Sequence, residues 1–171
     1  MPNHQYSNPS VKFLIIGCWL GAAAFGLVTL AGWVFGETAL SSISREWSPM
    51  SPSSAILFIL FGIALTLMIL YPGQKGARIY VWISVFTGTA VALLLFSLSI
   101  QEIHLNTEHL GFTVIETVGM SPVGHMSPVT AVCFILTGLT FFFLLFPFQQ
   151  KTNSIVVSLI LSLLLLILGL V

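Results

Sequence analysis

Hydrophobic residues along the chain gather into five long runs that polar segments separate. Each run has about 17 to 25 residues, the length that an α-helix needs to cross a hydrocarbon core about 30 Å thick. The predicted spans are residues 13–36, 53–71, 79–100, 129–148 and 155–171. The pattern predicts an all-α, polytopic transmembrane helical bundle over residues 13–171, preceded by the segment 1–12 and interrupted by the loop 101–127.

The composition supports this prediction. Of the 171 residues, 57% are hydrophobic and 6% are charged, whereas a soluble domain carries about 25% charged residues. Five Lys and Arg balance five Glu, so there is no basic field that would hold nucleic acid. The expected partner is the lipid bilayer, and nucleic-acid binding is excluded.

The basic residues predict the orientation, because Lys and Arg in short loops are retained on the cytoplasmic side. Four of the five lie before the first span or in the loops after the second and fourth spans, and only Arg45 lies in the other set of loops. The four are Lys12, Lys75, Arg78 and Lys151. We therefore expect a cytoplasmic N-terminus, with segment 1–12 inside and loop 101–127 outside.

An internal repeat accompanies the spans. The segment Met50–Gly62 recurs as Met126–Gly138, and Met, Ser, Pro, Ala, Phe, Ile, Leu and Gly fall in register. Each copy opens an inward-running helix, so the unit is a pair of spans. In each copy the Ser is a natural N-cap and the Pro occupies the first helical position, where no amide hydrogen is missed. The candidate motif residues are Met50, Ser51, Pro52, Met126, Ser127 and Pro128.

Two interpretations of this motif stay open. It can be a helix start with a packing consensus and no ligand. Alternatively, two equivalent helix N-termini, each with a positive dipole end, can flank a site that opens to the outside.

Small residues predict where helices approach each other. Gly17, Gly21, Gly32 and Gly36 in the first span and Gly88 in the third occur at helical spacings that allow close contact. These faces are expected to pack within the chain, and the alternative is a homodimer seam.

Loop 101–127 is the most polar segment and has room for a site. Its candidate sensor residues are His104, His109, His125, Glu102 and Glu108. Histidine can bind metal or titrate near neutral pH, but His104 and His109 do not share a helix face well. Simple solvation, a pH or metal sensor, and haem ligation remain alternatives. No cofactor or metal is predicted.

No ionisable residue lies inside a predicted span, which disfavours proton relays and voltage sensing. The cytoplasmic loops are too short for a catalytic site, and phosphate-binding and kinase motifs are absent from the sequence. We therefore expect no enzymatic activity on this chain.

With its repeated Met-Ser-Pro motif, the chain resembles the multi-span N-terminal sensory region of bacterial sensor histidine kinases and diguanylate cyclases. The resemblance covers about residues 11–171 and is strongest at Met50–Gly62 and Met126–Gly138. It implies a multi-pass protein of the bacterial inner membrane that supplies signal input, as in two-component systems. It also implies a sixth span and a cytoplasmic kinase or cyclase output domain in cis, which this chain lacks, so a truncated sensor is expected.

Two other functions remain as alternatives. The chain can be a small complete membrane protein that acts as a transporter or channel subunit, for which hydroxyl side chains would have to line a path. It can also be an assembly subunit that packs against a larger complex through its glycine-rich first span.

Overall fold

The structure is a computed structural model that describes residues 9–36, 50–101, 117–118, 121–122, 126–145 and 151–168. Within these ranges the protein is helical apart from short turns and connections and one short pair of strands. The helices are α1 (Pro9–Phe35), α3 (Pro52–Leu70), α4 (Lys75–Ile100), α5 (Pro128–Leu145) and α6 (Lys151–Leu168). The predicted helical architecture is thus confirmed over these five described helices, and their arrangement across a membrane stays a prediction.

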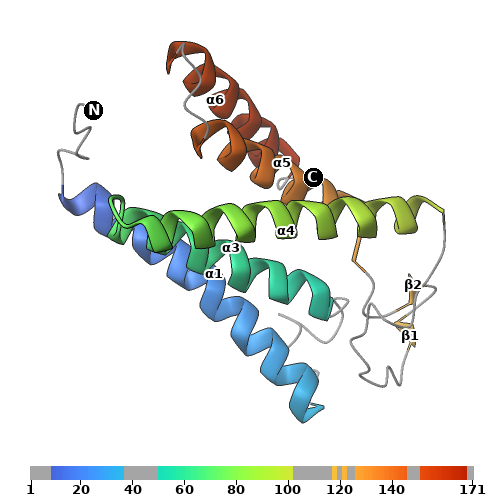
Figure 1. Cartoon of the computed structure of the whole chain (residues 1–171). Coiled ribbons are helices and arrows are strands. Elements are labelled where there is room, and N and C mark those ends of the chain that lie inside the picture. The colour runs from blue at the N-terminus through green and yellow to red at the C-terminus, as the bar shows by residue number, and fades with distance from the viewer. Residues whose placement is uncertain are drawn as a thin grey trace.

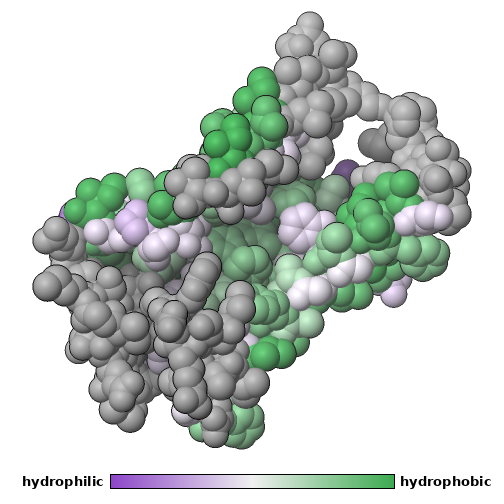
Figure 2. Space-filling model, turned by 180° about the vertical axis from the view of Figure 1, so that it is seen from behind, coloured by the Kyte–Doolittle hydropathy of each residue, from purple (hydrophilic) through white to green (hydrophobic). Residues whose placement is uncertain are grey.

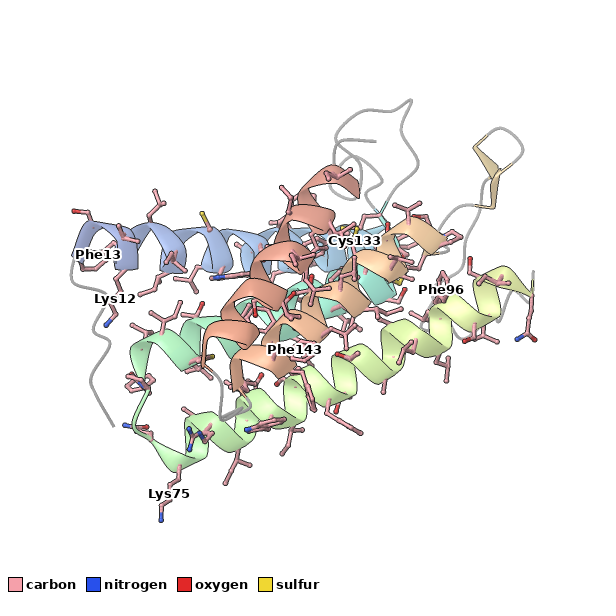
Figure 3. All side chains as sticks on the ribbon, turned by 90° about the horizontal axis from the view of Figure 1, so that it is seen from above. Lys12, Phe13, Lys75, Phe96, Cys133 and Phe143 are labelled. Atoms are coloured by element: carbon pink, nitrogen blue, oxygen red, sulfur yellow. The ribbon has the colours of Figure 1, made fainter. Side chains whose placement is uncertain are left out.

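The helices pack in chain order. α1 lies against α3, α3 against α4, α4 against α5, and α5 against α6. In Figure 1 the α1 and α3 pair lies below α4, and α5 and α6 rise above it. Lys12 and Lys75 lie at the same end of the bundle, and Phe96 lies toward the opposite end (Figure 3). The described basic side chains therefore gather where α1 and α4 begin.

The strands form a small antiparallel pair in the segment predicted as a loop. β1 (Thr117–Val118) pairs with β2 (Ser121–Pro122), with Thr117 opposite Pro122 and Val118 opposite Ser121. Hydropathy did not predict this pair, because two-residue strands are too short to show an alternating pattern.

Among the described residues, three helices are long and apolar enough to cross a membrane. They are α1 over Ser10–Phe35, α3 over Pro52–Leu70 and α4 over Lys75–Ile100, and Pro128–Phe143 forms a shorter apolar helix. Figure 2 shows one face of the molecule, where hydrophobic side chains predominate over the described surface. These helices indicate a membrane protein.

The helices start earlier than the predicted spans. α1 begins at Pro9 and includes Lys12, and α4 begins at Lys75 after its N-cap residue Gln74. The predicted spans followed hydropathy, which rises only at Phe13 and Ile79. Helical hydrogen bonding continues through basic residues at an interface, since their long aliphatic stems can lie along the helix while the charge reaches water.

The core lies where α3, α4 and α5 meet. Phe61 of α3 is 2% exposed, and its ring stacks on Phe134 of α5 with a centroid distance of 6.0 Å and an interplanar angle of 12°. The tip of the Phe61 ring lies over Gly88 of α4, where an added Cβ would stand 2.9 Å from Cζ. Gly88 therefore makes room for the central aromatic side chain.

The two repeat copies occupy equivalent places. The glycine that ends each copy lies against the preceding helix: an added Cβ on Gly62 would stand 2.7 Å from the Trp19 carbonyl oxygen, and one on Gly138 would collide with Thr89. Moreover, the equivalent phenylalanines Phe58 and Phe134 contact each other, with ring centroids 5.1 Å apart. The helix pairs α1/α3 and α4/α5 therefore pack through equivalent glycines.

The likeness continues beyond the motif into the next helix. Tyr71-Pro72-Gly73-Gln74 precedes Lys75 at the start of α4, and Phe146-Pro147-Phe148-Gln149-Gln150 precedes Lys151 at the start of α6. α6 packs on α5 as α4 packs on α3. α6 is thus the counterpart of α4 in the repeat.

Candidate functional site at the repeated helix starts

The first copy of the motif forms a complete N-terminal cap. Ser51 has extended backbone angles (φ −63°, ψ 145°), and Pro52 occupies the first turn of α3. The Ser54 backbone N–H donates to Ser51 Oγ at 3.3 Å, and the Ser54 hydroxyl lies 2.7 Å from the same oxygen. Ser53 Oγ is 3.1 Å away. Ser51 therefore satisfies a backbone donor that a helix start would leave unpaired.

The end of α1 covers this cap. Trp33 Nε1–H donates to the Met50 carbonyl oxygen at 2.9 Å. Thr29, which is fully buried, donates to the Phe25 carbonyl at 3.0 Å and lies 4.0 Å from Met50 Sδ. As a result Ser51 is only 3% exposed and Pro52 is fully buried. The first helix start is closed off by side chains of α1.

The second copy has the same cap in a different environment. The Thr130 backbone N–H donates to Ser127 Oγ at 3.1 Å, and Thr130 Oγ1 lies 2.8 Å from that oxygen. Met126 is buried, at 3% exposure, but Ser127 and Pro128 are exposed. The two starts therefore share their local geometry and differ in what covers them.

This difference predicts unequal effects of the same substitution. Ser51→Ala should lower the free energy of unfolding by about 1–3 kcal/mol, because burial prevents water from replacing the lost acceptor. Ser127→Ala should cost roughly 0.5–1 kcal/mol, because its exposed helix start can be solvated. Denaturant titration of both purified variants in mixed micelles measures the two costs. Equal losses would contradict the assignment of a buried first cap.

The predicted packing glycines behave in three ways. An added Cβ on Gly17 or Gly21 would meet nothing within 4 Å among the described residues, so these two do not form the seam with α3. Gly36 ends α1 with φ +71°, a left-handed conformation that favours glycine at a helix C-terminus. Gly32 is buried, and Gly88 packs against α3. A homodimer seam at Gly17 and Gly21 stays a prediction.

The seam between α1 and α3 uses other residues. An added Cβ on Gly26 would stand 2.6 Å from the Ala55 carbonyl oxygen, and Ala23 lies against Gly62. Sequence reasoning missed Gly26, Thr29 and Trp33 as contacts of the motif. Gly62 and Gly138 were visible as the last matching residues of the repeat, a signal that could have identified them.

The loop candidates His104, His109, His125, Glu102 and Glu108 lie outside the described residues. Within the residues that are described, no group of three or more His, Cys, Asp or Glu could hold a metal ion. The two cysteines, Cys18 and Cys133, are free thiols.

Several hydroxyl groups within the helices donate back to their own helix, although the buried Ser158 Oγ has no hydrogen-bond partner among the described residues. Thr66 Oγ1 donates to the Gly62 carbonyl at 2.8 Å, and Thr89 Oγ1 to the Val85 carbonyl at 2.7 Å. The same bond to the carbonyl four residues earlier is made by Ser97, Thr137, Thr140 and Ser162. Such bonds satisfy polar groups inside an apolar medium.

No protein family, curated protein or solved structure matches the chain.

Proposed function

We propose that the chain is the membrane-integral signal-input region of a bacterial signal-transduction protein of the inner membrane. In this proposal the N-terminus is cytoplasmic, five helices cross the bilayer, and a kinase or cyclase domain on the same gene product supplies the output. A stimulus at the outer side would shift the bundle between two packings, and the output domain would respond to that shift.

The observation that carries the proposal is the pairing of two equivalent helix starts at one end of the bundle. Both starts are capped, and the first is tied to α1 through Trp33 and Met50. Lys12 of α1 and Lys75 of α4 lie at the other end of the bundle from these two helix starts (Figure 3). In this proposal a cytoplasmic domain would act at that basic end. In the proposed orientation, the end with the two motif copies would be the outer end and the basic end would be the inner end.

The helix interior favours signal input over transport. Several of its hydroxyl donors, such as Thr66 and Thr89, bond to carbonyls of their own helix, whereas the buried Ser158 Oγ has no hydrogen-bond partner among the described residues. The described core is built from aliphatic and aromatic side chains. A transport path would instead need polar groups directed toward a solute.

The mass of the native gene product tests the proposal. An antibody against Met1–Ser10 would be used on denatured membranes of the source organism. We expect a band well above the 18.6 kDa of this chain, because the output domain would be part of the same polypeptide. A band at 18.6 kDa would overturn the sensory proposal and favour a small transporter, channel or assembly subunit. Preabsorbing the antibody with the peptide is the control.

A further inference from the structure

The described cations lie at one end of the bundle without a carboxylate partner. Lys12 is in the first turn of α1, and Lys75 and Arg78 are in the first turn of α4. Lys12 and Lys75 share one end of the molecule (Figure 3). The chain has no Asp, its five glutamates lie within residues 37–46 and 102–116, and the described residues contain none of them. These two segments follow the far ends of α1 and α4, each of which is about 40 Å long.

Two tyrosines indicate the depth of this end in a membrane. Tyr71 follows α3 and is 45% exposed, and Tyr80 of α4 is 40% exposed. Tyrosine gathers at the level of the lipid headgroups, because its ring is apolar and its hydroxyl is polar. Lys75 and Arg78 lie between these tyrosines in the chain, and both are exposed. The two cations are therefore expected at the level of the lipid phosphates.

Helix stability does not account for cations at this place. The start of a helix carries a partial positive charge, which favours acidic residues there and disfavours basic ones. Lys75 and Arg78 occupy the first turn of α4, and the N-cap residue Gln74 makes no capping hydrogen bond with its side chain. Retention of basic residues explains on which side of a membrane they lie, but it supplies no counter-ion. An anion from outside the chain would balance this charge.

An exposed apolar stripe continues from the two cations along α4. It consists of Ile79, Ile83 and Phe86, which are 59%, 60% and 73% exposed. Residues three and four apart share a helix face, so the stripe begins one turn beyond Lys75. A phosphate beside hydrocarbon is the chemistry of a phospholipid, whereas a free phosphate or an acidic peptide would leave the stripe uncovered.

From this arrangement we propose that Lys75 and Arg78 bind the phosphate of an anionic phospholipid whose acyl chains lie along Ile79, Ile83 and Phe86. Arginine donates two parallel hydrogen bonds to a phosphate, and lysine adds a compact positive charge. Lys12 adds to the positive field at the same end (Figure 3). The proposal needs a membrane around the helices and does not depend on an output domain.

Native mass spectrometry of the full chain in a mild detergent tests this lipid site. The probes are phosphatidylglycerol and phosphatidylcholine with the same acyl chains. We expect the wild type to bind phosphatidylglycerol more tightly. In the variant with Lys75→Gln and Arg78→Gln, the dissociation constant for phosphatidylglycerol should rise by about fivefold for each cation removed. Phosphatidylcholine binding should stay as in the wild type.

Two variants are matched controls. Lys75→Arg combined with Arg78→Lys keeps both charges and should keep the preference for phosphatidylglycerol. Arg45→Gln removes a cation that the sequence places between α1 and α3, and it should keep the preference as well. Melting temperatures in phosphatidylcholine alone show whether all variants are folded.

Equal affinity of the wild type for the two lipids, or an unchanged preference after removal of both cations, would overturn the proposal. Displacement of phosphatidylglycerol by excess inorganic phosphate would identify a site for a soluble anion and would overturn it too. The lipid preference does not depend on the mass of the gene product, so the lipid site and the sensory function can fail separately.

Discussion

Replacing Gly62 with alanine should lower the free energy of unfolding by roughly 1–3 kcal/mol, the usual cost of overpacking a filled site. The new Cβ would stand 2.7 Å from the Trp19 carbonyl oxygen and 2.9 Å from the Ala23 Cβ. Neither atom can move without shifting α1, because one belongs to the backbone and the other is attached directly to it. Helices in a bilayer associate through close packing of this kind. Forcing α1 away from α3 therefore directly lowers the stability of the helix pair.

The matched control is Gly21→Ala on α1. Gly21 is exposed, and an added Cβ there would meet nothing within 4 Å, so its effect should lie within about 0.5 kcal/mol. Gly26→Ala should resemble Gly62→Ala, since its Cβ would stand 2.6 Å from the Ala55 carbonyl oxygen. Denaturant titrations in mixed micelles give all three values. Equal stability of the Gly62 and Gly21 variants would refute the close seam between α1 and α3.

The helices were predictable because a membrane helix must be both long and apolar. The five predicted runs correspond to the five described helices, and three of these are long and apolar enough to cross a membrane. Helix starts were less predictable. Hydropathy reports where side chains leave water, whereas α4 begins at Lys75, before the apolar residues, because the backbone can bond as a helix in both environments.

The packing face of α1 could not be predicted from its sequence. Small residues occur on two of its faces: Gly17 and Gly21 on one, and Ala23 and Gly26 on the other. A helix that is apolar all round gives no polar side to orient it. The choice is made by the shape of α3, whose Gly62 admits the α1 backbone at Trp19 and Ala23.

In the candidate site, the motif predicted the helix caps but not their burial. Ser51 and Ser127 were predicted to be equivalent N-caps, and both do cap their helices. Their burial differs because α1 ends near the first cap with Trp33, while the corresponding end of α4, Leu98-Ser99-Ile100, carries no tryptophan. Local sequence determines the cap, but the neighbouring helix determines whether the cap is buried.

The second large effect is expected at the aromatic contact between α3 and α5. Phe134→Ala should lower the free energy of unfolding by roughly 1–3 kcal/mol. Phe134 is 6% exposed, and its ring contacts both Phe58 and Phe61 of α3. A comparable substitution in a soluble core costs about 3–5 kcal/mol. The smaller value follows because a side chain that leaves a membrane core enters lipid, so the loss is mainly one of packing.

Phe86→Ala is the matched control, because this phenylalanine of α4 is 73% exposed. Its ring lies on the outside of the bundle, so its removal should change stability by less than about 0.5 kcal/mol. Denaturant titration of both purified variants in mixed micelles measures the two losses. Similar losses of stability in both variants would show that the ring contact does not hold α5 against α3.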